Sequence, residues 1–434
     1  MRIGIVPGLI ASDGGIYQYS LNMIRAIAEA KRDGCDDEFI VYADPNDPAF
    51  AGLDLHGLEF RSILPLTIKR RAFRTLGQLT GGIATRTLAG LRKTRRQVPV
   101  RDCDSVVPRK EFKRWFERNG TKLVLYPIST TLSFEAGVPY IMAIHDLQHR
   151  LQPEFPEVSA NGEWEYREYL FRNAIRNATL LLADSETGKE DILSFYGEYG
   201  VTEDRIKVLP LIPACTLAPE ITETEQQRIY QKYSLPERYF FYPAQFWPHK
   251  NHVGIVEALG LLRERHGLKI PIAFCGSHSG AIREQVFNEV KAAAARLDLA
   301  TEIHYLGYVP DADMSGLYAG AAALIMPTFF GPSNTPVVEA WESSCPVLTS
   351  DIRGIREQAG DAAILVDPRS VEAIAEGINR LWTNENLRRT LAERGRERLR
   401  AFTPNDFRVR LMQILEEAKA ILDNDNAEGP FVSR

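Results

Sequence analysis

The sequence of 434 residues contains no apolar run of about 18 residues, the length expected of a membrane-spanning helix. Its five cysteines are scattered and show no CxxC spacing. Such usage is typical of a reduced compartment and argues against a disulfide framework or a zinc site. The opening stretch MRIGIVPGLIASDGG lacks the charged and then apolar layout of a signal peptide. We therefore expect a cytoplasmic location.

An excess of charge of one sign is also missing. The 52 Lys and Arg against 57 Asp and Glu leave a formal net charge of -5, which argues against nucleic acid as the main partner. No GxGxxG follows the first strand of either predicted domain, which disfavours a nicotinamide dehydrogenase. The 44% hydrophobic and 25% charged content is that of an ordinary globular protein whose domains can bury a core.

Short apolar runs alternate with longer helical patterns, which is typical of parallel α/β layers. We predict two Rossmann-like, doubly wound α/β domains that face each other across a cleft, where the carboxyl ends of their strands meet. The predicted strands are 2–7, 38–42, 123–126, 140–144, 179–183 and 206–209, then 239–242, 272–275, 303–306, 323–326, 346–349 and 363–366. The predicted units are a first domain over 1–212 with a basic insertion at about 66–115, a linker over 213–237, a second domain over 238–404, a C-terminal helix over 405–422 and a disordered tail over 423–434.

Two polar motifs follow predicted strands of the first domain. Ser12-Asp13-Gly14-Gly15 lies between strand and helix, where its glycines would let backbone N–H groups approach an anion or a sugar. A tight turn is the simpler interpretation of the same residues. His145 ends a buried strand, where it could donate to a sugar hydroxyl or exchange a proton. A structural histidine paired with the adjacent Asp146 is equally consistent with the sequence.

Two further motifs follow strands of the second domain. In PAQFWPHKNH, residues 243–252, Lys250 stands where a cation would meet a diphosphate and stabilise the charge on a departing nucleotide. A second loop enters a helix with Pro336 at a favoured first-turn position. We expect the backbone N–H groups of Ser333, Asn334 and Thr335 to point into the cleft. Glu339, one turn further on, could bind a vicinal diol or only complement the helix dipole.

Together these residues resemble the retaining family-4 glycosyltransferases, over nearly the whole chain and most strongly from Phe241 to Val366. The most specific parts are PAQFWPHKNH and the run PTFFGPSNTPVVEAW that starts at Pro327. The resemblance implies the GT-B fold, with the C-terminal helix packing back on the N-terminal domain. It also implies a nucleotide-sugar donor, a UDP- or GDP-sugar, and retention of anomeric configuration with no obligatory metal or cofactor.

The same resemblance suggests roles for individual residues. Lys250 corresponds to the basic residue on the donor phosphates, and His145 to a histidine near the donor sugar. Glu339 corresponds to the second glutamate of an E-x7-E motif that holds the ribose. By the same correspondence, the glycine loop is Gly14-Gly15, and the wall beside the base is the backbone at Tyr308 and Val309.

Two positions depart from the family pattern. Gly331 stands where the first glutamate of the motif normally contacts the transferred sugar, and Gln245 stands where an arginine is usual. Lys250 would then carry most of the charge opposite the phosphates. Asp311-Ala312-Asp313 has the D-x-D spacing of metal-dependent transferases, but an N-cap role for Asp311 or Asp313 is the better interpretation. Glu190 fits a capping box that starts at Thr187.

The strongest local charge lies between Lys69 and Arg114, with 14 Lys and Arg against 3 Asp and Glu. Apolar residues recur there at helical spacing, so we predict an amphipathic cationic helix. Segment 68–114 could lie on an anionic membrane, making the protein peripheral on its inner face and suiting a glycan or lipid-linked acceptor. A solvated basic face above core-facing residues is equally consistent.

The sequence leaves two other functions open. One is a sugar-nucleotide epimerase on the same two-domain fold, which would convert the donor without an acceptor. The other is a non-catalytic nucleotide-sugar-binding protein, which the missing glutamate and arginine make conceivable. Whether donor turnover needs an added acceptor distinguishes a transferase from the epimerase.

Overall fold

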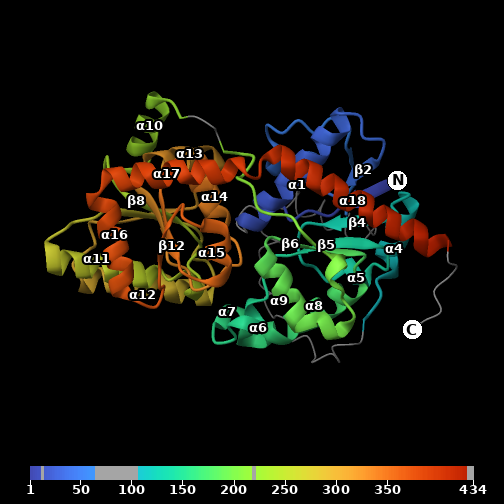
Figure 1. Ribbon diagram of the computed structural model, residues 1–434, viewed down its shortest axis with the longest axis horizontal. Helices are drawn as coiled ribbons and strands as arrows, with labels where there is room; N and C mark the ends of the chain where they lie inside the picture. The colour runs from blue at the N-terminus through green and yellow to red at the C-terminus, as the bar shows by residue number, and fades with distance from the viewer. Residues whose placement is uncertain (11–13, 64–105, 218–220, 428–434) are drawn as a thin grey trace, which may run out of the picture.

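The computed structural model describes residues 1–10, 14–63, 106–217 and 221–427. Two α/β domains lie side by side (Figure 1). The predicted basic helix within 68–91, most of the basic insertion and the last residues of the predicted tail lie outside the described residues.

The first domain is built on a seven-stranded sheet in which all pairs are parallel, in the order β3-β2-β1-β4-β5-β6-β7. Its strands are β1 (Arg2–Ile5), β2 (Glu38–Val41), β3 (Glu59–Phe60), β4 (Leu123–Tyr126), β5 (Tyr140–Ile144), β6 (Leu180–Ala183) and β7 (Ile206–Val208). The helices are α1 (Gly15–Arg32), α4 (Lys110–Arg118), α5 (Leu132–Glu135), α6 (Gln148–Leu151), α7 (Pro156–Ser159), α8 (Glu163–Asn177) and α9 (Glu186–Tyr196). Continuous apolar runs such as Leu123–Tyr126 form these strands because helices cover both faces of the sheet.

The second domain has a six-stranded parallel sheet in the order β10-β9-β8-β11-β12-β13. Its strands are β8 (Phe240–Pro243), β9 (Ile272–Cys275), β10 (Ile303–Gly307), β11 (Ala323–Met326), β12 (Val347–Ser350) and β13 (Ile364–Val366). Its helices are α10 (Glu223–Tyr233), α11 (His252–His266), α12 (Ala281–Arg296), α13 (Asp311–Gly320), α14 (Thr335–Glu342), α15 (Arg353–Ala359), α16 (Val371–Thr383) and α17 (Glu385–Arg400). The chain continues into a last helix, α18 (Pro404–Ala427). The two-domain doubly wound fold predicted from the sequence is confirmed.

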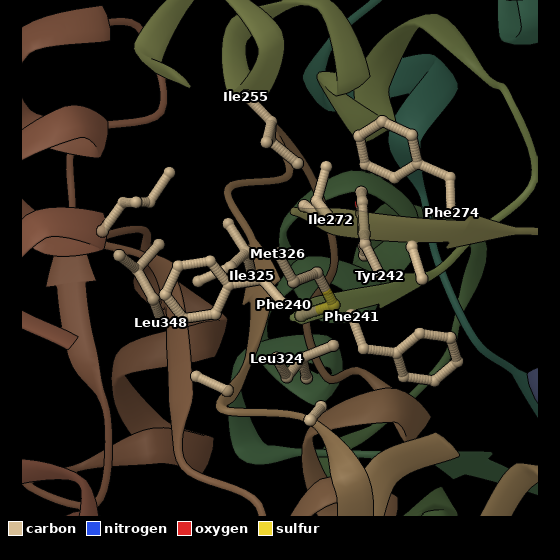
Figure 2. Close-up of a cluster of buried hydrophobic side chains, with 14 of the residues drawn as sticks. Phe240, Phe241, Tyr242, Ile255, Ile272, Phe274, Leu324, Ile325, Met326 and Leu348 are labelled. Atoms are coloured by element: carbon tan, nitrogen blue, oxygen red, sulfur yellow. The ribbon is translucent and has the colours of Figure 1, made fainter. Parts of the chain in front are cut away.

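The core of the second domain is rich in aromatic side chains from its central strand. Phe240, Phe241 and Tyr242 of β8 are fully buried between the neighbouring strands. Figure 2 shows them among side chains of β9, β11 and β12, with Ile255 of α11 covering one side. Because this strand is packed on both faces, the loop that follows it starts from a fixed position.

The predicted linker at 213–237 contains a helix, α10, that belongs to the second domain. Ile229 is buried in that domain's core, and Arg228 and Lys232 form ion pairs with Asp313 of α13. Thr222 and Glu225 form a capping box at the start of α10. The mostly polar sequence hid this helix, since only one of its residues is buried.

The last helix, α18, returns to the first domain. It runs along α1 (Figure 1), and Phe407, Leu411 and Leu415 lie in the first domain's core. The return predicted for 405–422 is confirmed, although the helix continues to Ala427, into the predicted tail. No helix among the described residues is long and apolar enough to cross a membrane.

Candidate active site

Several of the predicted site residues follow strands at the points where the strand order reverses. In the first sheet β1 lies between β2 and β4, and in the second sheet β8 lies between β9 and β11. Ligands of such sheets bind outside the carboxyl ends of the strands at these switch points. Gly14 and Gly15 follow β1, Lys250 follows β8, and Glu339 lies in the helix that follows β11.

The loop that carries Lys250 is held rigidly. Tyr242 donates to the carbonyl oxygen of Lys250 at 3.0 Å. The next residue, Asn251, has a φ of 57° and donates through Nδ2 to the carbonyl oxygens of Pro327 and Pro368 at 3.0 and 2.8 Å. These bonds fix the start of the Lys250 side chain against the loop after β11.

The ammonium group of Lys250 lacks a carboxylate partner. Within the described residues no Asp or Glu oxygen lies within ion-pair distance of its Nζ. Burial lowers the pKa of Lys250 to about 8, while the more distant Asp146 and Glu157 act to raise it. A half-buried cation without a counter-ion is a place where an anionic ligand gains a strong interaction.

Gln245, at the position where the resemblance expects arginine, contacts an arginine from elsewhere. The guanidinium of Arg283, near the start of α12, hydrogen-bonds Gln245 Oε1. The same guanidinium lies 4.7 Å from the centre of the Trp247 ring, a cation–π distance. Arg283 was missed by the sequence analysis, because its 38-residue separation from Gln245 is visible only in the folded chain.

Glu339 is buried in α14 beside one hydroxyl group. Tyr318 donates to its Oε2 at 2.8 Å. Burial raises the pKa of Glu339 to about 7, and the hydrogen bond from Tyr318 opposes this rise. The carboxylate is therefore poised to gain from further hydroxyl donors, as a ribose diol would supply.

The predicted N–H groups at the start of α14 are only partly available. The backbone N–H of Asn334 donates to Gln358 Oε1 at 2.9 Å, so it is already occupied by a protein acceptor. Thr335 instead lies against the glycine loop, because a Cβ on Gly15 would be only 2.8 Å from its Oγ1. Gly14 has a φ of 58° and is the N-cap residue of α1. Because Gly15 has no side chain, its backbone lies directly against the Thr335 hydroxyl at the start of α14.

His145 is paired with Asp184 rather than with the adjacent Asp146. Its Nδ1 lies 3.0 Å from Asp184 Oδ2, and its Nε2 lies 2.9 Å from the carbonyl oxygen of Pro127. Burial acts to lower the pKa of His145, but the Asp184 carboxylate outweighs it and raises the pKa to about 9. Asp146 instead binds Arg167 at 2.9 Å. The imidazolium therefore has both N–H groups occupied.

The remaining predicted positions lie at the edge of the second sheet. Tyr308 is 63% exposed, whereas Val309 is buried. The N-cap prediction for Asp311 and Asp313 is wrong, since Pro310 is the cap residue. Asp311 accepts from Gln18 of the first domain at 3.1 Å. Asp313 is neutralised by α10 through Arg228 and Lys232, and no group of three potential metal ligands exists in the described parts of the chain.

The capping box predicted at Thr187 is also wrong. Ser185 is the N-cap of α9, accepting from Gly188 N at 3.1 Å, and Glu190 pairs with Arg353 of α15. Glu190 therefore contributes to the contact between the domains and does not cap α9.

Comparison with known proteins shows what the chain is similar to. Residues 224–398 match the family model described as glycosyl transferases group 1. O-antigen chain mannosyltransferase B of Escherichia coli is 27% identical over 57% of this chain. Mannosylfructose-phosphate synthase of Agrobacterium fabrum is 19% identical over 66% of it. The matched regions span 63% and 65% of the lengths of these two relatives.

Solved structures match nearly the whole chain. Sucrose-phosphate synthase from Thermosynechococcus elongatus gives a TM-score of 0.68 at 16% identity, covering 97% of this chain and 99% of that one. HepE from Anabaena in complex with UDP-glucose gives a TM-score of 0.66 at 16% identity, covering 97% of this chain and all of that one. Residues 224–398, most of the second domain, are thus similar to the glycosyl transferases group 1, and the two domains together have the GT-B fold.

Proposed function

We propose that the protein is a retaining glycosyltransferase that moves a hexose from a nucleotide-sugar to a glycan or lipid-linked acceptor. The observation that carries this proposal is the Lys250 ammonium group, which is held half-buried and has no carboxylate partner among the described residues. A donor diphosphate would supply the missing anion, and a cation there stabilises the charge that grows on the departing nucleotide.

The proposed donor extends from Lys250 to Glu339. The two loops are tied together, since Thr328 Oγ1 donates to the His249 carbonyl oxygen at 3.0 Å and Phe329 N donates to it at 2.8 Å. We assign the diphosphate to Lys250, the ribose diol to Glu339 and the wall beside the base to Tyr308 and Val309. The HepE structures hold UDP and UDP-glucose, and the curated relatives include mannosyltransferases, so UDP- and GDP-sugars are the donors to try first.

The proposed reaction needs no protein nucleophile. The bond between the anomeric carbon and the diphosphate oxygen breaks, and the acceptor oxygen attacks from the same face. The acceptor proton passes to the leaving phosphate, which retains the electron pair of the broken bond. The protein contributes by positioning the reactants and by stabilising charge.

We assign His145 a positioning role in this proposal. Both of its ring nitrogens already have partners, and the pair with Asp184 joins the loops after β5 and β6. A cytoplasmic location and an anionic membrane surface bound through 68–114 stay predictions.

A thermal-shift screen with UDP-, GDP-, ADP- and dTDP-sugars tests donor binding directly, because a ligand that binds the native state raises the unfolding temperature. No shift with any donor would overturn the proposal. With the donor identified, product formation should require an acceptor, and NMR should show the donor's anomeric configuration in the product. Donor conversion without acceptor would indicate the epimerase, and binding without turnover the non-catalytic alternative.

A further inference from the structure

Gly331, where the resemblance expects the first glutamate, faces the side chain of Asn334. Its φ is 147°, and a Cβ placed on it would lie 2.4 Å from Asn334 Nδ2 and 2.9 Å from Oδ1. A side chain at position 331 and the present Asn334 side chain would therefore overlap. The carboxamide of Asn334 fills the space in which a residue 331 side chain would begin.

The Asn334 side chain is buried without a partner for its amide donor. The residue is 6% exposed, and Nδ2 has no hydrogen-bond partner among the residues that the structure describes. The adjacent Ser333 Oγ is also buried and has no partner within the described part of the chain. Buried polar groups are normally hydrogen-bonded, so two adjacent exceptions need an explanation.

The backbone of Asn334 is fully engaged and fixes the side chain in place. Gln358 accepts from its N–H and donates to its carbonyl oxygen, both at 2.9 Å. The side chain makes no capping hydrogen bond at the start of α14. It therefore has no visible structural role as a helix cap, although it occupies the cap position.

We propose that the Asn334 carboxamide, assisted by the Ser333 hydroxyl, binds hydroxyl groups of the transferred sugar in place of the family's glutamate. This inference rests on the proposed function and names the residues that recognise the sugar. A glutamate can only accept hydrogen bonds, whereas the amide Nδ2 donates two, so the sugar would present acceptor oxygens here. The neutral amide also adds no negative charge beside the donor diphosphate.

The test compares affinities for UDP and GDP with those for UDP-glucose and GDP-mannose, measured by titration calorimetry. The variants are Asn334→Ala, which removes the amide, and Asn334→Asp, which keeps the shape but loses the donor. Ser343→Ala is the matched control, since its hydroxyl is also buried and unpartnered but lies just beyond the other end of α14.

We expect both Asn334 variants to lose about 5- to 30-fold in affinity for the preferred nucleotide-sugar, the effect of one or two hydrogen bonds. Affinity for the free nucleotide should stay within about twofold, a difference too small to count as a lost hydrogen bond. Equal losses for nucleotide and nucleotide-sugar would indicate a structural role and overturn the inference, as would unchanged affinities. The proposed function itself fails only if wild type binds none of the donors in the thermal-shift screen, and that outcome is distinct from a failure of this inference.

Discussion

His249 Nδ1 lies 2.6 Å from Glu157 Oε1. This contact joins the loop after β8, which carries Lys250, to α7 of the first domain. Burial, assisted by the nearby Lys250 charge, lowers the pKa of His249 to about 4. The ring is therefore neutral at pH 7 and donates to a buried carboxylate. Phe155 packs against both His249 and Phe329, so the two domains touch directly beside Lys250.

Glu157→Ala should weaken this contact. A hydrogen bond to a charged group contributes about 1.5–3 kcal/mol, so we expect a lower thermal unfolding midpoint. Because Glu157 acts to raise the pKa of Lys250, its loss should also lower that pKa further below 8. The exposed Glu154→Ala in the same segment is the control and should change neither property. An unchanged unfolding midpoint in Glu157→Ala would show that the His249–Glu157 hydrogen bond does not stabilise the protein.

Lys250 should make donor binding weaken at alkaline pH. Only the protonated amine attracts the diphosphate, so with a pKa of about 8 the affinity for a nucleotide-sugar should fall about tenfold between pH 7.5 and 9. Lys250→Arg should bind with a flatter profile, since arginine stays charged throughout this range. Lys250→Met should bind weakly at every pH. A wild-type profile as flat as that of the arginine variant would contradict a role for this amine.

Glu339 should act at the other end of the pH range. The carboxylate must be ionised to accept hydrogen bonds from both ribose hydroxyls, so affinity should rise about fivefold from pH 6 to pH 8, the loss of protons from Lys250 near pH 8 included. Tyr318→Phe removes the hydrogen bond that lowers the pKa of Glu339, so the midpoint of this rise should move to higher pH. Glu339→Gln should abolish the rise. Calorimetry at several pH values measures the wild type and both variants.

The fold was predictable wherever local sequence determines it. Leu123–Tyr126 and Tyr140–Ile144 were predicted with their observed bounds, because a buried parallel strand is a continuous apolar run. The two-residue strand β3 was missed, since it lies at the sheet edge and is only half-buried. Helix α10 was missed for a similar reason, since it buries little.

The site was predictable as a set of loops but not as a set of contacts. Lys250, Glu339 and the glycine loop follow strands, and strand ends can be read from the sequence. The partner of His145 could not be read from the sequence, because Asp184 lies 39 residues away. The adjacent Asp146 was the simpler choice. The availability of an N–H group also depends on distant residues, as Gln358 shows for Asn334.

Arg283 is expected to replace part of the charge that is missing at Gln245. Arg283→Gln should weaken nucleotide-sugar binding about 3- to 10-fold, the usual effect of a partly exposed cation near a phosphate. Adding Gln245→Arg to that variant should restore affinity for the nucleotide-sugar. Gln245→Arg alone should not raise this affinity to the same extent, because it places a second cation beside Arg283. A double-mutant cycle measures this coupling. The exposed Arg265→Ala controls for net charge, and strictly additive effects would contradict the compensation.

Glu357 of α15 caps a helix of the other domain. Its two carboxylate oxygens accept from the backbone N–H groups of Glu186 and Thr187 at 2.9 and 3.0 Å, at the start of α9. Glu357→Ala should expose these N–H groups and destabilise the start of α9 by about 1 kcal/mol, the usual effect of losing an N-cap.

Hydrogen exchange of the peptide that begins α9 measures this effect, which should appear as about fivefold faster exchange at these two amides. Nearby Arg353, which pairs with Asp191 at 2.8 Å, holds the same interface, so Arg353→Ala should add to the effect. Glu376→Ala, an exposed carboxylate in α16, is the matched control. Equal exchange in Glu357→Ala and wild type would show that these hydrogen bonds do not hold the domains together.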